Sequence, residues 1–313
     1  MEKPKIVTVT LNPCMDKTVE TSSFGVGRTN RVLTSRTDVG GKGVNVARAL
    51  IGCGVEFAAT GIAAGLNGRR LVEALENMGV PCAFCAAQGE TRVNLKVHDL
   101  STGEMTELNE RGSEAGDAYA AFLKTLRQFL PDADVLTLSG SLPPDLGADV
   151  YYDLTAEANR LGVRVILDAD GDALRRGIQA KPYAIKPNLA EFRALVGEDV
   201  RTVPEIVAAA RKLIADGVGM VAVSCGAEGA VIVRGALAIQ TIPFPIAVGS
   251  AAAAGDSMVA ALAWSLVQER TLIEAAKIMT AAGTCTASLP GTQVATLNDA
   301  LARAQDVPIR FLD

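Results

Sequence analysis

Apolar strands and helices alternate along most of this chain, and that alternation restricts the fold more than any other feature. The stretches Ile6–Thr10, Val135–Ser139 and Val163–Asp168 are short and rich in apolar and β-branched residues. Such strands are typical of a parallel sheet that helices cover on both faces. The helical stretches Arg69–Met78 and Asp149–Leu161 each stop at a glycine, a common helix end. We therefore expect an α/β protein with a mostly parallel central sheet.

The other expected elements follow the same order. Further strands are predicted at 57–61, 184–186, 220–224 and 230–233, and further helices at 45–51, 190–196 and 204–216.

Two segments interrupt this order and predict a second, smaller sheet. Lys17–Asp38 is polar and carries β-branched residues at alternate positions. Arg92–Leu108 consists of two amphipathic runs around Ser101-Thr102-Gly103, which is typical of a hairpin. Both segments are too polar for the centre of a covered sheet. We expect them to form a lid that stands off the main body and can close over a substrate.

Length and charge exclude several classes of protein. At ~150 residues per domain, 313 residues fit two domains or one large α/β domain with an appendage. A net charge of −5 makes a poor general nucleic-acid binder, so no nucleic-acid partner is expected. We expect no signal peptide, and the longest apolar stretch, Ser257–Val267, is too short to span a bilayer. We therefore expect a cytoplasmic protein without a membrane partner.

Histidine and cysteine usage limits the chemistry further. The single histidine, His98, excludes a histidine-rich metal centre, and no G-x-S-x-G precedes a helix as in many hydrolases. The pair Cys82 and Cys85 has redox or zinc spacing but lacks a second such pair, so free thiols are expected.

Small residues precede an apolar helix near the carboxyl end. Met258, Leu262 and Leu266 have helical spacing, so a helix begins near Asp256, directly after four alanines and Gly255. Free N–H groups at a helix N-terminus bind anions, and small residues let a ligand approach closely. Asp256 is then either a helix N-cap or a base that takes a proton from an attacking hydroxyl.

Two charged residues near the amino end, Lys42 and Asp16, lie next to an expected helix and an expected strand. Three glycines surround Lys42 in a loop that enters a helix, although the Walker A pattern is absent. The loop is either a tight turn or a place where a polar ligand approaches the backbone. Asp16 follows the first strand, at the edge where open α/β sheets bind ligands, and could hold sugar hydroxyls or form an Asx turn.

Two further sites could bind a charged ligand, one a metal ion and the other a phosphate. Asn188 and Glu191 lie three residues apart at the start of a helix, where they form either a cap or a water-mediated Mg²⁺ site. Arg92, at the edge of the expected lid, is either solvated or grips a phosphate.

These features together resemble one family. The chain is similar to the ribokinase-like sugar kinases of the phosphofructokinase B type, almost from end to end. The motifs that carry the resemblance are Gly40-Gly41-Lys42-Gly43-x-Asn45-Val46, Ser139-Gly140-Ser141-Leu142-Pro143, Lys186-Pro187-Asn188-x-x-Glu191 and Ala254-Gly255-Asp256-Ser257. Within the family, Thr8–Pro13 and Thr91–Lys96 look most like the bacterial 1-phosphofructokinases, and tagatose-6-phosphate kinases are also similar.

The resemblance implies a fold and a reaction. Residues 1–313 would form one three-layer α/β/α kinase domain, with a lid from about 14–38 and 91–110. The expected enzyme uses ATP and Mg²⁺ to convert fructose 1-phosphate to fructose 1,6-bisphosphate. Tagatose-6-phosphate kinase and 6-phosphofructokinase are the alternatives, and a non-catalytic sugar-phosphate-binding protein is a remoter one. A nicotinamide dehydrogenase would need a G-x-G-x-x-G where Leu11-Asn12-Pro13-Cys14 stands.

The resemblance also implies residue roles. Asp256 would be the catalytic base, beside an anion hole of backbone N–H groups from Ala253, Ala254 and Gly255. Contacts to the sugar phosphate are implied for Asp16, Gly41, Lys42, Asn45, Arg92 and Ser141, with Arg28 or Arg31 as a weaker lid contribution. Contacts to ATP are implied for Lys186, Asn188, Ser224, Gly226, Gly229 and Gly283. Glu191, with Asn188, would hold Mg²⁺ through water.

Three structural expectations concern the charges of the cleft, the loop before Asp256 and the oligomeric state. Lys42 and Arg92 are expected to meet in one cleft as two unpaired cations that need the substrate phosphate. Ala253 stands where the family has glycine, which costs about 1 kcal/mol or more if this position has a positive φ. A lid with one apolar face favours a homodimer in which two lids pack together.

Overall fold

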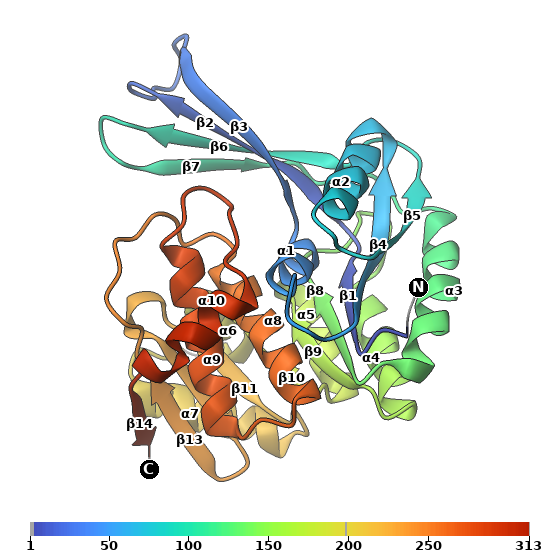
Figure 1. Ribbon diagram of the computed structural model, residues 1–313, viewed down its shortest axis with the longest axis vertical. Coiled ribbons are helices and arrows are strands. Elements are labelled where there is room, and N and C mark those ends of the chain that lie inside the picture. Colours follow the sequence, from blue (N-terminus) through green and yellow to red (C-terminus); the bar gives the residue numbers. More distant parts are fainter. Residues whose placement is uncertain (1–2, 198, 313) are drawn as a thin grey trace.

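The computed structural model describes residues 3–197 and 199–312, in which the strands form two sheets (Figure 1). In the larger sheet, ten strands are ordered β14 (Ile309–Leu312), β13 (Leu237–Thr241), β12 (Ala230–Arg234), β11 (Val221–Ser224), β10 (Ala184–Ile185), β9 (Arg164–Asp168), β8 (Val135–Ser139), β1 (Ile6–Thr10), β4 (Phe57–Ala64) and β5 (Cys82–Ala87). Neighbours from β5 to β11 pair in parallel, and the pairs from β11 to β14 are antiparallel. The predicted mostly parallel sheet is confirmed.

Helices cover both faces of this sheet. One face packs against α1 (Lys42–Ala49), α2 (Gly65–Asn77), α8 (Ala254–Val267), α9 (Leu272–Ala287) and α10 (Leu297–Arg303). The other packs against α3 (Ala118–Phe129), α4 (Val150–Arg160), α5 (Gly171–Gly177), α6 (Leu189–Val196) and α7 (Val203–Ala215). Successive residues of β1 alternate between the two cores, with Ile6 in the first and Val7 in the second. The α/β/α arrangement therefore follows from strands that are apolar on both faces.

Helix α8 is the central helix of the first face. Most of its residues are buried, and it packs closely against α9. Its Trp264 donates an indole hydrogen bond to the carbonyl oxygen of Cys53 at 3.0 Å, and the guanidinium of Arg270 lies 5.5 Å from the centre of its ring. Among the described residues, no helix is long and apolar enough to cross a membrane.

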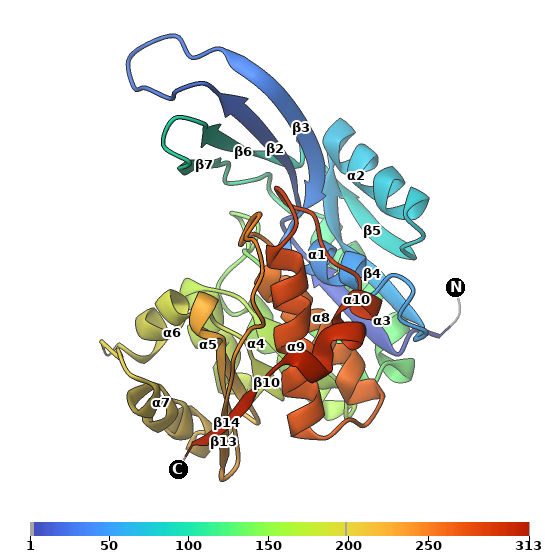
Figure 2. The same ribbon diagram turned by 60° about the vertical axis from the view of Figure 1, so that its left-hand side comes forward.

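Four strands form a small sheet in the order β3 (Val32–Gly40), β2 (Cys14–Thr21), β6 (Arg92–Asp99) and β7 (Met105–Asn109). Strand β2 runs parallel to β6 and antiparallel to β3, and β7 pairs with β6 as the predicted hairpin. The small sheet projects from the main body above the ends of α8 and α9 (Figures 1 and 2). A second sheet was predicted, and its strands extend one to three residues beyond the expected polar segments on the side nearest the main body.

Candidate active site

A cavity of about 620 Å³ lies at the carboxyl ends of β9, β10 and β11, against the first turn of α8. Its walls contain all the positions expected to contact ATP: Lys186, Asn188, Ser224, Gly226, Gly229 and Gly283. They also contain Lys42, Glu191 and the run from Ala253 to Asp256. Parallel strands place their carboxyl ends along one edge, so loops far apart in sequence meet there.

Asp256 is the third residue of α8 and is only 7% exposed. One of its carboxylate oxygens, Oδ2, accepts a hydrogen bond of 2.8 Å from Nδ2 of Asn45 on α1. Burial and the nearby carboxylate of Asp168 raise the pKa of Asp256 to about 6, against the lowering effects of Lys42, Asn45 and Lys186. The N-cap of α8 is Ala253, so Asp256 does not cap this helix. A buried, weakly acidic carboxyl at a cavity wall has the properties of a general base.

Lys42 lies in a network of ion pairs and is not an unpaired cation. Its Nζ is 3.0 Å from Oδ1 of Asp168 and 3.3 Å from Oε1 of Glu191. Burial alone lowers the pKa of Lys42, yet Asp168, Glu191 and Asp256 together raise it above its ordinary value. The expectation that Lys42 and Arg92 form a pair of free cations is therefore wrong, because two carboxylates already neutralise Lys42.

Asn188 and Glu191 form a reciprocal cap at the start of α6. Oδ1 of Asn188 accepts from the backbone N–H of Glu191 at 2.9 Å, and Oε2 of Glu191 accepts from the N–H of Asn188 at 2.8 Å. The capping alternative is thus present in the structure, and it orients the other oxygen of Glu191 toward Lys42.

Carboxylate oxygens in the cavity wall fit a hydrated magnesium ion. Oδ2 of Asp168 is buried and has no hydrogen-bond partner among the described residues. Glu191 shares Lys42 with Asp168, so the two carboxylates lie on one side of the cavity. Oxygen ligands that leave room for water are the ones Mg²⁺ prefers.

The start of α8 is strained at its N-cap, Ala253, and crowded in its first turn, at Gly255. Ala253 has φ of 60° and ψ of −1°, a left-handed conformation that costs an L-residue with a side chain about 1–2 kcal/mol. Lys186 can lie close to Gly255 only because glycine has no side chain. A Cβ at this position would lie 2.8 Å from Nζ of Lys186. Both residues line the cavity.

Replacing Ala253 with glycine should raise the free energy of unfolding by about 0.5–1 kcal/mol, because the positive φ carries no penalty for glycine. The measurement is the urea midpoint of purified protein. Ala254→Gly is the matched control, since Ala254 is an ordinary helical residue, and glycine there should destabilise by up to about 1 kcal/mol. Equal destabilisation by both changes would show that the left-handed backbone at Ala253 is not strained.

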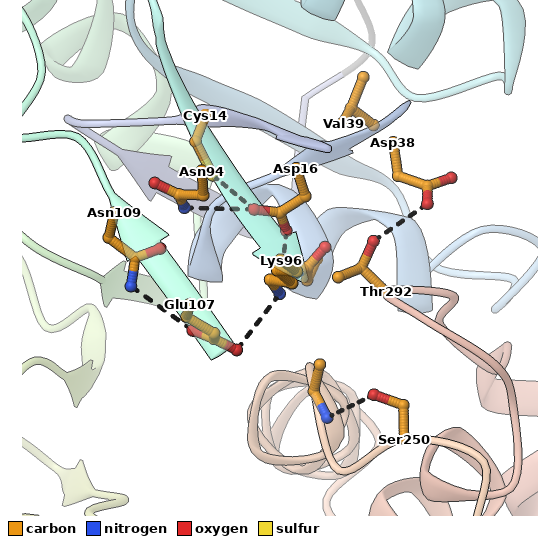
Figure 3. Close-up of polar contacts among 12 residues, drawn as sticks. Cys14, Asp16, Asp38, Val39, Asn94, Lys96, Glu107, Asn109, Ser250 and Thr292 are labelled. Carbon is orange, nitrogen blue, oxygen red and sulfur yellow. Dashed lines mark hydrogen bonds and ion pairs between the residues drawn. The ribbon is translucent and has the colours of Figure 1, made fainter. Parts of the chain in front are cut away.

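A polar group lies where β2 and β6 leave the main body (Figure 3). Asp16 accepts a hydrogen bond of 3.2 Å from Nδ2 of Asn94, and Nζ of Lys96 is 3.6 Å from its other oxygen. Lys96 also approaches Glu107 on β7 at 3.9 Å. Oδ1 of Asn94 is buried and has no partner among residues 3–197 and 199–312. The group therefore has an unused acceptor next to a carboxylate and a cation.

Arg92 connects three segments at the base of the small sheet. Its Nε and Nη2 donate to the carbonyl oxygen of Asn12, at 3.3 and 3.1 Å, and its Nη1 donates to that of Glu110 at 3.1 Å. Nη2 also lies 3.5 Å from Oγ of Ser141, so the structure brings Arg92 and Ser141 together. Gly41 adopts a φ of 109°, and a Cβ there would lie 3.1 Å from Cα of Pro13. Arg28 instead bonds Ser23 in the β2–β3 loop.

Four residues of this region have no role in the sequence analysis: Asp168, Asn94, Lys96 and Arg48. Asp168 ends a predicted strand, which is a usable signal because ligands bind at that edge. Asn94 and Lys96 lie two residues apart on β6 and therefore share one face of the strand. The hairpin prediction included both residues but did not assign them to the site.

Comparison with known proteins agrees with this geometry. Residues 9–299 match the family described as "pfkB family carbohydrate kinase". The chain belongs to the pfkB family of carbohydrate kinases. As a pfkB kinase, it is 41% identical over 279 residues to a 1-phosphofructokinase of Rhodobacter capsulatus, covering 88% of each chain. It is 31% identical to the ATP-dependent 6-phosphofructokinase isozyme 2 of Escherichia coli strain K12, covering 94% of this chain and 96% of the other.

The fold of this pfkB kinase is also that of solved relatives. The crystal structure of phosphofructokinase-2 from Escherichia coli in complex with substrates and products superposes with a TM-score of 0.90 at 31% identity, covering 96% of this chain and 99% of the other. A tetrameric inhibited form of the same enzyme gives a TM-score of 0.89 at 30% identity, covering 97% and 99%. The ribokinase-like fold and the family expected from the motifs are confirmed.

Proposed function

We propose that this kinase transfers the γ-phosphoryl group of ATP to fructose 1-phosphate and forms fructose 1,6-bisphosphate. The observation that carries the proposal is Asp256: a buried carboxyl of raised pKa, in the first turn of a helix, at the wall of a nucleotide-sized cavity. The 41% identity to a 1-phosphofructokinase supports the choice of acceptor.

In this mechanism Asp256 accepts the proton of the sugar 6-hydroxyl as that oxygen attacks the γ-phosphorus. Its proton affinity suits the task, because a carboxyl of pKa about 6 is deprotonated at neutral pH and still basic. The N–H groups that follow Ala253 point out of the first turn of α8, where a helix carries partial positive charge. They stabilise the charge that spreads over the transferred group.

The nucleotide occupies the cavity of about 620 Å³. Lys186 approaches the phosphates beside Gly255, while Ser224, Gly226 and Gly229 bound the ribose side and Gly283 lies under the adenine. Glu191 and the unpartnered oxygen of Asp168 would hold Mg²⁺ through water, with Asn188 fixing Glu191 by the cap. The bound ion supplies positive charge to the phosphate oxygens.

The acceptor sugar binds between the small sheet and α8. Asp16 and the free Oδ1 of Asn94 accept from its hydroxyl groups, because both are buried acceptors on one face of the sheet. Arg92 and Lys96 supply positive charge for its existing phosphate. Gly41 and Asn45 border the same space from the start of α1.

A second candidate acceptor is fructose 6-phosphate, because a 6-phosphofructokinase is a relative of almost equal length. Tagatose 6-phosphate also remains a candidate acceptor. All three reactions use the same base and nucleotide site. Fructose 1-phosphate differs from the other two acceptors in the carbon that carries its phosphate, and fructose 6-phosphate and tagatose 6-phosphate differ from each other in the configuration at C4.

Assays of ADP release against a panel of sugar phosphates test the proposal. We expect kcat/KM for fructose 1-phosphate to exceed that for fructose 6-phosphate and tagatose 6-phosphate by at least about tenfold, or about 1.4 kcal/mol of discrimination. A larger kcat/KM for either alternative would correct the acceptor and leave the kinase assignment intact. Turnover of none of them would contradict the proposed function.

We also predict a homodimer through the small sheet. Val32 and Leu33 on β3, and Leu108 on β7, are more than half exposed, and both strands are edges of this sheet. Exposed apolar side chains on open edges favour coverage by a second copy. Light scattering at micromolar concentration should give twice the chain mass, and Leu108→Arg should shift the population toward monomer. A wild-type monomer at that concentration would remove the prediction.

A further inference from the structure

Arg48 on α1 joins three segments beside the candidate base. Its Nη1 lies 3.1 Å from the carbonyl oxygen of Val39 on β3, 3.0 Å from Oδ1 of Asn45, and 3.1 Å from the carbonyl oxygen of Thr292 after α9. Figure 3 shows Val39 beside Asp38 and a contact between Asp38 and Thr292. In this contact the Thr292 hydroxyl donates to Oδ2 of Asp38 at 3.2 Å. The side chain therefore lies where the small sheet, α1 and the loop after α9 meet.

The Asn45 amide has a different partner on each side. Its Oδ1 accepts from Arg48, and its Nδ2 donates to Oδ2 of Asp256 at 2.8 Å. A guanidinium can only donate, and an ionised carboxylate can only accept. Only one orientation of the amide satisfies both neighbours, so the guanidinium selects the edge of Asn45 that faces Asp256.

We propose that Arg48 is a positioning residue for phosphoryl transfer, which acts by holding the Asn45 amide with its N–H toward Asp256. This inference rests on the proposed function, in which Asp256 is the base. Arg48 itself contacts neither the nucleotide cavity nor Asp256, so its effect passes through Asn45.

Loss of Arg48 has a defined electrostatic consequence. Without its donor, the Asn45 amide can rotate and present Oδ1 to Asp256, which favours the protonated carboxyl. The charged groups that act on Asp256 are Asp168 from β9, Lys42 from α1 and Lys186 after β10, and those that act on Arg48 are Asp38, Arg36, Asp16 and Asp256. Rotation of the amide therefore moves the acid limb of kcat to higher pH.

The test is a set of pH–kcat profiles on the full-length enzyme with saturating ATP and fructose 1-phosphate. Arg48→Met should lower kcat by about tenfold or more, which is the effect of one lost hydrogen bond to a charged group. Its acid limb should lie about one pH unit above that of the wild type, with KM for ATP unchanged. Arg48→Lys keeps a charged donor and should fall between the two.

The matched control is Arg36→Met. Arg36 is an exposed arginine on β3 that pairs with Asp38 and contacts no residue of the site cavity. Its replacement removes a positive charge from the same region without touching Asn45, so its kcat profile should follow that of the wild type.

A double-mutant cycle decides whether Arg48 acts through Asn45. In the Asn45→Ala background, Arg48→Met should cause no further loss of kcat, because the amide it orients is gone. Losses that multiply, or an Arg48→Met profile with the wild-type acid limb, would overturn the inference. A wild-type enzyme without kinase activity would instead refute the proposed function, so the two failures are distinguishable.

Discussion

Asp256→Asn is expected to lower kcat for fructose 1-phosphate by about 10²–10⁴-fold while KM for ATP stays near the wild-type value. Asparagine has almost the same shape and can still accept from Asn45, but it cannot take a proton from the sugar hydroxyl. Loss of orientation in the reacting complex can deepen the effect. Steady-state measurement of ADP release gives both constants.

The matched control for this change is Asp172→Asn. Asp172 is an exposed aspartate that pairs with Arg175 on α5, away from the cavity walls. Its kinetics should equal those of the wild type. Near wild-type turnover by Asp256→Asn would reject the base and leave a purely structural role for this carboxyl.

Free fructose is expected to react at least about 10²–10⁴-fold less efficiently than fructose 1-phosphate. Lys96 is buried beside Asp16, and Arg92 is held against Ser141, so two positive groups border the expected position of the sugar phosphate. Each charge-assisted hydrogen bond to that phosphate is worth about 1.5–3 kcal/mol. A sugar without the phosphate loses two such contacts and the orientation that they give. Comparing kcat/KM for the two sugars measures the effect.

Arg92→Ala should reduce this preference by raising KM for fructose 1-phosphate about 10- to 150-fold, with little change in KM for ATP. Arg36→Ala, on the same small sheet, is the control and should leave both constants unchanged. Arg92 also bonds the carbonyl oxygens of Asn12 and Glu110. An equal rise in KM for both substrates would therefore mean that it supports the joint of the small sheet and does not bind the phosphate.

Local pattern predicted most of the architecture. Strands β1 and β8 agree with their predicted bounds, because buried strands are marked by continuous apolar and β-branched residues. Helix starts were less accurate: α2 begins at Gly65, four residues before the predicted start. Its first turn is Gly65-Leu66-Asn67-Gly68, and two glycines and an asparagine there interrupt the apolar spacing that revealed the rest.

The site was predictable where one motif forms one wall. The segments around Asn188 and Asp256 each supply neighbouring residues to the cavity, so their grouping was visible in sequence. The pairing of Lys42 with Asp168 was not, because it joins residues 126 positions apart. The positive φ of Ala253 was also undecidable, since alanine is compatible with an ordinary helix start and only the path of the loop imposes the strain.

The single tryptophan of the chain lies on the same helix as the candidate base. Trp264 is eight residues beyond Asp256, which at 1.5 Å per residue is about 12 Å along α8. Its ring is almost completely buried, donates a hydrogen bond to the carbonyl oxygen of Cys53 and lies under the guanidinium of Arg270. Packing therefore fixes its surroundings. The enzyme thus contains one tryptophan, whose emission reports on the helix that carries its chemistry. Ligand binding near that helix can therefore be followed by tryptophan fluorescence, without a dye or an engineered label.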